Sequence, residues 1–144
     1  MVNSGVRTRR QVWLLPVGVY LLAVAYLTLA PRFGTSGALT PNFVPFASIF
    51  DLLFDSAATP AGIVKNLVGN LVLLAPLAVF IYVGLRWTVT RTLGAVAVTS
   101  LLIELMQGLG LTDGRQANVD DLLLNLAGAA LALLALRTAS RSDA

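Results

Sequence analysis

The sequence contains no cysteine and no histidine. Without cysteine there is no disulfide framework, and the thiolate and imidazole ligands of structural zinc are both missing. The lack of histidine also excludes the Ser–His and Cys–His pairs of nucleophilic catalysis. We find no signature of a cofactor and expect none. The absence of cysteine does not identify a compartment.

Charge is scarce as well. Only 12% of the residues are charged and 57% are hydrophobic, whereas a soluble domain averages about 25% charged residues. This composition is typical of a protein that crosses a membrane several times, and 144 residues suit one compact domain. No basic patch interleaved with aromatic residues is present, so we expect no nucleic-acid partner.

Four apolar runs are long enough to cross a bilayer as helices, which takes about 20 residues each. The expected spans are residues 12–30, 63–85, 92–111 and 119–136. Residues 12–136 would form one transmembrane domain between polar tails at 1–11 and 137–144. Pro76 lies inside the second run and predicts a bend there. The predicted fold is an all-α integral membrane protein.

The first apolar run follows Arg7, Arg9 and Arg10, an arrangement that a secretory signal peptide also has. The run is longer than a typical signal core. The best small-residue cleavage point is after Ala30, where Pro31 disfavours cutting. We therefore expect an uncleaved first span.

A shorter amphipathic pattern lies between the first two runs. Apolar residues recur at helical spacing at Phe46, Ile49, Phe50 and Leu53. The opposite side carries Ser48, Asp51 and Asp55. This pattern predicts a helix over residues 46–55 on the outer side, too short to span a membrane. It could lie on the bilayer surface or form a re-entrant lid over a polar site.

The distribution of Lys and Arg predicts the orientation, because cytoplasmic segments are enriched in both. With the N-terminus inside, the cytoplasmic parts carry Arg7, Arg9, Arg10, Arg86, Arg91, Arg137 and Arg141. Their one acidic residue is Asp143. The outer parts hold fewer bases, Arg32, Lys65 and Arg115. They hold most of the acids, Asp51, Asp55, Glu104, Asp113, Asp120 and Asp121. We predict that both termini are cytoplasmic.

Polar residues interrupt three of the four apolar runs. A carboxylate near the centre of a membrane helix costs about 2.5–3.5 kcal/mol on insertion scales, so it normally faces protein, a partner or water. At a rise of about 1.5 Å per residue, Asn70, Glu104 and Asn125 lie at a similar depth. We predict an outward-open pocket lined by Asn66, Asn70, Glu104, Gln107, Asp120, Asp121 and Asn125, with Arg115 above it. Small residues would permit close helix approach at Gly69, Gly108, Gly110, Gly128 and Ala129.

Each of these residues also has a purely structural interpretation. Asp120 and Asp121 would stabilise the N-terminus of the fourth helix. Asn66 and Asn70 could bond to neighbouring helices. Glu104 could form an ion pair with Lys65 or Arg115, and Arg115 could instead pair with Asp113 or Asp120. The sequence leaves these alternatives open.

Three segments carry a resemblance to a known family. They are 42–46 (NFVPF), 66–77 (NLVGNLVLLAPL) and 104–128. The last contains the ordered series Glu104, Gln107, Arg115, Asp120, Asp121, Asn125 and Gly128. Over roughly residues 12–136 the chain resembles the VanZ-like family of small membrane proteins, named for a protein associated with teicoplanin resistance. It departs from the family pattern at Asn118, where the pattern has an acid.

The resemblance implies a multi-span protein of the bacterial plasma membrane with a link to glycopeptide sensitivity. Our first hypothesis is a non-catalytic envelope protein. Its pocket would bind an amphiphilic ligand, such as a lipid-linked cell-wall precursor or a glycopeptide. Carboxamides suit sugar hydroxyls and peptide groups, and the acids suit a cationic group. Membrane lipid and a second copy of the chain are the other expected partners.

Two further functions stay open. An enzyme acting on a lipid-linked head group could use Glu104 as general base, with Asp120 and Asp121 as ligands of a hard cation such as Mg²⁺. Arg115 or Lys65 would then meet a phosphate. An ion- or proton-coupled transporter is the other alternative, because buried acids can relay protons. Four spans are few for transport, although a dimer could supply more.

Overall fold

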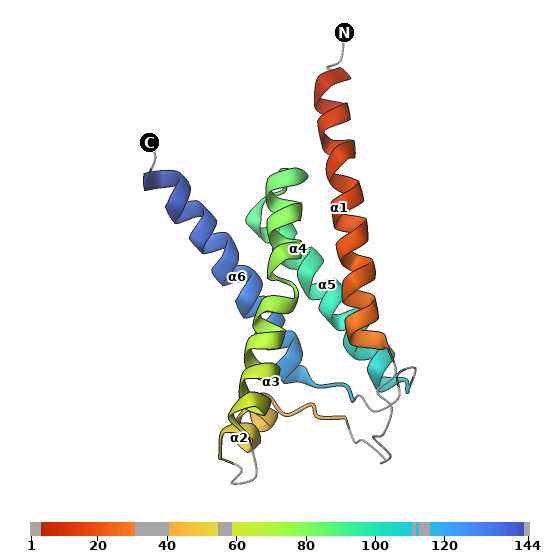
Figure 1. Ribbon diagram of the computed structural model, residues 1–144, viewed down its shortest axis with the longest axis vertical. Coiled ribbons are helices and arrows are strands. Elements are labelled where there is room, and N and C mark those ends of the chain that lie inside the picture. Colours follow the sequence, from red (N-terminus) through yellow and green to blue (C-terminus); the bar gives the residue numbers. More distant parts are fainter. Residues whose placement is uncertain (1–3, 31–40, 55–58, 111, 113–115, 143–144) are drawn as a thin grey trace.

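The computed structural model describes residues 4–30, 41–54, 59–110, 112 and 116–142. The regular structure of these residues is helical, and one isolated parallel bridge joins Asn42 to Asn118. The long helices lie side by side as a bundle, with both ends of the chain at one end of it (Figure 1). The predicted all-α fold is confirmed.

Four stretches of helix are long and apolar enough to cross a membrane. They are Gln11–Leu29 within α1 (Ser4–Leu29), Pro60–Gly84, α5 (Val89–Gly108) and α6 (Val119–Ser142). The number of spans agrees with the sequence. The helices extend past the predicted start of the first span and the predicted end of the fourth, because polar residues beyond the apolar runs continue the helical turns. Helix α5, the third span, ends at Gly108, and Gly110 adopts a φ of 71° in the turn that follows.

The second span is broken into three consecutive elements. These are α3 (Pro60–Leu73), α4 (Ala75–Val79) and η1 (Phe80–Gly84), the last with π-helical hydrogen bonding. Pro76 has no N–H to donate and its ring clashes with the carbonyl one turn earlier. Accordingly the regular helix is interrupted at Leu74, which has φ −108° and ψ 0° and lies between α3 and α4. The predicted bend is confirmed.

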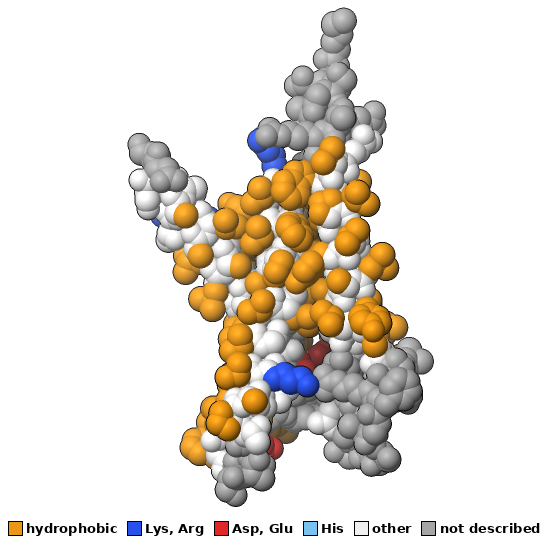
Figure 2. Space-filling view, in the orientation of Figure 1, with side chains coloured by type: hydrophobic (Ala, Val, Ile, Leu, Met, Phe, Trp, Pro, Cys, Tyr) orange, Lys and Arg blue, Asp and Glu red, His pale blue; other side chains and the backbone are white. Residues whose placement is uncertain are grey.

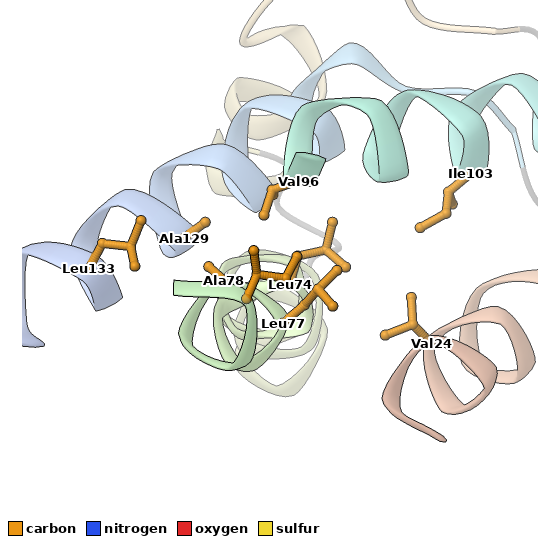
Figure 3. Close-up of a cluster of buried hydrophobic side chains, with 9 residues drawn as sticks. Val24, Leu74, Leu77, Ala78, Val96, Ile103, Ala129 and Leu133 are labelled. Carbon is orange, nitrogen blue, oxygen red and sulfur yellow. The ribbon is translucent and has the colours of Figure 1, made fainter. Parts of the chain in front are cut away.

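The apolar core sits where the spans meet. Side chains from all four spans converge around Leu74 and Leu77 of the second span (Figure 3). Helix α6 packs against α3, α4 and α5, and α1 packs against η1, α5 and α4. Outside the core, apolar side chains such as Leu22 and Leu131 are exposed. They form a band over the middle of the bundle, with charged side chains above and below it (Figure 2).

Helices α3 and α6 approach each other closely at Gly128 of α6. A Cβ atom there would lie 1.7 Å from the backbone oxygen of Leu71 in α3. The predicted close approach is therefore confirmed at Gly128, and Ala129 beside it is fully buried. It is wrong for Gly69 and Gly110, where a Cβ would meet nothing within 4 Å. At Gly108 a Cβ would come within 3.2 Å of the Ala117 side chain.

The amphipathic helix is α2 (Ala47–Phe54), which confirms the short helix predicted over residues 46–55. It contacts α3 and α6 and lies at the end of the bundle opposite the termini (Figure 1). Its side chains divide between two environments. Ser48, Ile49 and Leu52 face a pocket, whereas Phe50 and Phe54 are exposed and stack on each other with ring centroids 6.1 Å apart. Asp55 lies outside the described residues.

The crossing at Gly128 can be tested by adding one methyl group. We expect Gly128→Ala to destabilise the bundle by about 1–3 kcal/mol or more, because the methyl group must displace the α3 backbone. Gly69→Ala is the matched control, since its methyl group meets open space. Thermal unfolding in detergent compares the two variants. Equal unfolding temperatures for both would contradict the tight crossing.

The orientation can be tested with single cysteines, because the chain has none of its own. We expect Asp51→Cys in α2 to react with a membrane-impermeant maleimide on intact cells. Ser140→Cys near the end of α6 should react only after permeabilisation. The reverse labelling pattern would overturn the predicted cytoplasmic termini.

Candidate functional site

The segments that precede α2 and α6 are fastened to each other. The Asn42 N–H donates to the Ala117 oxygen at 2.9 Å, and the Val119 N–H donates to the Asn42 oxygen at 3.0 Å. The Asn42 carboxamide also donates to the Ser48 hydroxyl at 2.6 Å. Two stretches of the sequence far apart in the chain, around residues 42–46 and 117–121, therefore form one unit.

Asp120 holds the start of α2. Its carboxylate accepts hydrogen bonds from the Phe46 N–H and, at 3.2 Å, from the Ile49 N–H. These amides lie at the helix N-terminus, where a carboxylate satisfies free donors and is favoured by the helix dipole. Phe46 has a φ of 67°, a left-handed conformation that is unfavourable for a side chain of this size. The bond from Asp120 helps to offset this cost.

Asn118 and Glu104 hold the start of α6. The Asn118 side-chain oxygen accepts from the Asp120 N–H at 3.1 Å, which is a typical N-cap bond. The Asn118 N–H in turn donates to Glu104 Oε2 at 2.6 Å. Helix α6 is thus capped by Asn118. The capping interpretation expected Asp120 to bond at the start of α6, but its carboxylate bonds at the start of α2. Glu104 is 8% exposed and its bond crosses from α5 to the segment before α6.

Other polar side chains connect the spans in pairs. Asn70 of α3 donates to Asp121 Oδ1 of α6 at 2.6 Å. Asn125 of α6 donates to the Ser100 hydroxyl of α5 at 3.0 Å. Gln107 of α5 donates to the Thr28 oxygen of α1 at 3.1 Å. Of the three residues that the sequence places at a similar depth, Asn70 and Asn125 each bond to a neighbouring helix, whereas Glu104 bonds to the backbone before α6.

A pocket of about 360 Å³ lies beside these bonds. Its polar lining consists of Ser48, Lys65, Asn66, Asn70, Gln107, Gln116, Asn118, Asp120 and Asp121. Its apolar lining consists of Ile49, Leu52, Leu67 and Leu124. The walls come from α2, α3, α5, α6 and the segment that leads into α6.

The structure places the predicted site residues in two groups. Asn66, Asn70, Gln107, Asp120 and Asp121 line the pocket. Glu104 and Asn125 do not line it: Glu104 bonds to the Asn118 N–H before α6, and Asn125 bonds to Ser100 of α5. Arg115 lies outside the described residues. Ligand binding by all of these residues stays a prediction.

Sequence reasoning missed several lining residues. Asn118 had a signal, since asparagine directly before an apolar helix is a preferred N-cap. Ser48 had one as well, because the amphipathic pattern puts it on the polar side of α2. Gln116, Leu67 and Leu124 carry no local signal, and only the packing of α2, α3 and α6 brings them to one pocket.

The acids of the site are engaged by protein donors. Asp120 is 1% exposed and uses both of its oxygens on backbone amides. Lys65 forms no hydrogen bond or ion pair with any residue in the described part of the chain, so the alternative Glu104–Lys65 pair is not formed. Within those residues there is also no group of three or more His, Cys, Asp or Glu side chains that could hold a metal ion. The roles of Glu104 as a general base and of Asp120 and Asp121 as metal ligands stay predictions.

Hydrogen exchange can test whether Asp120 holds α2. Asp120→Asn removes the charge and one acceptor, so we expect about tenfold faster exchange of the Phe46 and Ile49 amides, as a charged hydrogen bond is worth about 1.5–3 kcal/mol. Asp51→Asn, on the exposed side of α2, is the matched control and should leave this exchange unchanged. Unchanged exchange in Asp120→Asn would show that the cap does not hold α2.

Comparison with known proteins gives one match. The chain matches the model of the VanZ/LLP1 family over residues 17–140, nearly its whole length. No curated protein and no solved structure matches it. The matched region contains the whole of the second and third spans, most of the first and fourth, α2 and every residue that lines the pocket. The chain therefore belongs to the VanZ/LLP1 family.

Proposed function

We propose that this protein is a non-catalytic component of the bacterial plasma membrane whose pocket binds the head group of an amphiphilic cell-envelope ligand. The observation that carries the proposal is the pocket itself. Its volume of about 360 Å³ is in the range of small-molecule sites, and it combines polar and apolar walls.

The polar wall suits a head group rich in hydroxyl and amide groups. Asn66 and Gln116 present carboxamides, which both donate and accept hydrogen bonds. Ser48 adds a hydroxyl whose oxygen already accepts from Asn42, which leaves its proton available to donate. Sugars and peptides offer matching groups, and a lipid-linked cell-wall precursor carries both.

The surroundings of the pocket suit an acyl chain. On α2 and α3, next to the pocket, Phe50, Phe54, Val64 and Val68 are exposed on the outside of the bundle. An apolar chain that leaves the pocket between these helices would reach surface of the same character as the lipid. This geometry favours a ligand with one polar and one apolar end.

The family name suggests a role in glycopeptide resistance. A lipophilic glycopeptide such as teicoplanin combines sugar, peptide and acyl parts, as does a lipid-linked wall precursor. We infer that the protein lowers teicoplanin sensitivity by binding one of these two ligands in the outer leaflet.

A pocket-filling variant tests the proposal. Leu67→Trp places an indole in the pocket wall, whereas Leu131→Trp places the same group on an exposed position of α6. With membrane levels matched, we expect wild type and Leu131→Trp to protect a susceptible host from teicoplanin and Leu67→Trp to lose that protection. Purified proteins should bind teicoplanin or a lipid-linked muropeptide precursor in the same order.

Two results would count against the proposal. Binding of both probes by Leu67→Trp at the level of wild type would show that the pocket is not the site. Absence of protection by wild type, together with pocket-dependent binding of the precursor, would remove the glycopeptide part and retain the envelope ligand.

A further inference from the structure

Lys65 is the only lysine of the chain, and it lies in the second turn of α3 on the wall of the pocket. Its side chain is exposed, and no residue in the described ranges forms a hydrogen bond or ion pair with it. An ammonium group offers three donors. Lys65 therefore brings a positive charge and unused donors to the pocket.

The acids that share the pocket do not neutralise Lys65. Asp120 is buried and directs its two oxygens to the Phe46 and Ile49 amides. Asp121 accepts from the Asn70 carboxamide at 2.6 Å. These bonds stabilise the ionised carboxylates and direct the bonded oxygens toward protein amides and not toward the Lys65 ammonium. Lys65, Asp120 and Asp121 thus line one pocket, and Lys65 forms no ion pair with either carboxylate.

Neutral hydrogen-bond donors line the same pocket as Lys65. Asn66 is its neighbour in α3 and is exposed, and Gln116 lines the pocket from the segment before α6. Lysine binds phosphate as a point charge, and side-chain amides add hydrogen bonds to the remaining oxygens. Such a set is better matched to an anionic group with several acceptor oxygens than to a cation.

We propose that the pocket holds a phosphate group at Lys65, with Asn66 and Gln116 as supporting donors. This inference rests on the proposed function and deepens it, because it makes the ligand a phosphate-bearing amphiphile. It also reverses the expectation from the sequence that the acids of the pocket attract a cationic group. The phosphate could belong to a lipid head group or be free in solution, and the experiment separates these sources.

The experiment is a titration of the purified protein in an uncharged detergent, followed by native mass spectrometry. The probes are dioctanoyl phosphatidic acid, dioctanoylglycerol, which has the same chains without phosphate, and inorganic phosphate. The variants are Lys65→Gln, Lys65→Arg, Arg91→Gln and the pocket-filling Leu67→Trp. Arg91 is exposed near the start of α5, at the end of the bundle away from α2, and controls for the loss of one positive charge (Figure 1).

We expect wild type to bind phosphatidic acid about tenfold more tightly than dioctanoylglycerol, the difference that one charged hydrogen bond supplies. Lys65→Gln should lose this preference, whereas Lys65→Arg and Arg91→Gln should keep it. If inorganic phosphate binds and this binding depends on Lys65, free phosphate is a source of the ligand. If inorganic phosphate does not bind, the site is assigned to lipid phosphate. Both results support the phosphate site.

The inference is overturned if wild type binds both lipids equally, or if Lys65→Gln retains the preference for phosphatidic acid. The proposed function is judged separately by Leu67→Trp. If Leu67→Trp abolishes binding of both lipids and Lys65→Gln changes neither, the pocket binds an amphiphile without a phosphate requirement. If wild type binds none of the probes, including the precursor and teicoplanin, both proposals fail.

Discussion

A carboxylate on one helix holds the first amides of another, and the pocket depends on this contact. Asp120 in the first turn of α6 accepts from the Phe46 and Ile49 amides at the start of α2. Helices as short as the eight residues of α2 are marginal on their own in water. The cap therefore fixes the wall that carries Ser48 and Ile49, and Glu104 supports it indirectly by holding Asn118.

The second constraint is the crossing of α3 and α6. Gly128 lets the α6 backbone approach the α3 backbone at Leu71 more closely than any residue with a side chain would permit. That crossing brings Asn70, the residue before Leu71, within hydrogen-bonding distance of Asp121. Lys65, on the same helix as Asn70, lines the pocket. Packing of small residues and pairing of polar residues are thus two parts of one arrangement.

The arrangement explains how a mostly apolar protein keeps several acids at one end of its bundle. Burying a carboxylate is costly unless hydrogen bonds replace water. Asp120 and Glu104 each have protein donors in the structure. These bonds fix the frame of the pocket, whose other polar lining groups are carboxamides, a hydroxyl and the ammonium of Lys65. The proposed ligand chemistry follows from this division.

The sequence by itself determined the four spans, the bend at Pro76 and the short helix predicted over 46–55, because apolar run length and proline chemistry act locally. Residue size predicted close approaches at Gly69, Gly110 and Gly128, and of these three only Gly128 has one. The sequence also singled out five residues that line the pocket. Only the tertiary structure decided the partners. Which amide a carboxylate accepts from depends on how α2, α3 and α6 pack, so Asp120 caps α2, Glu104 bonds to Asn118, and Lys65 is left facing the pocket.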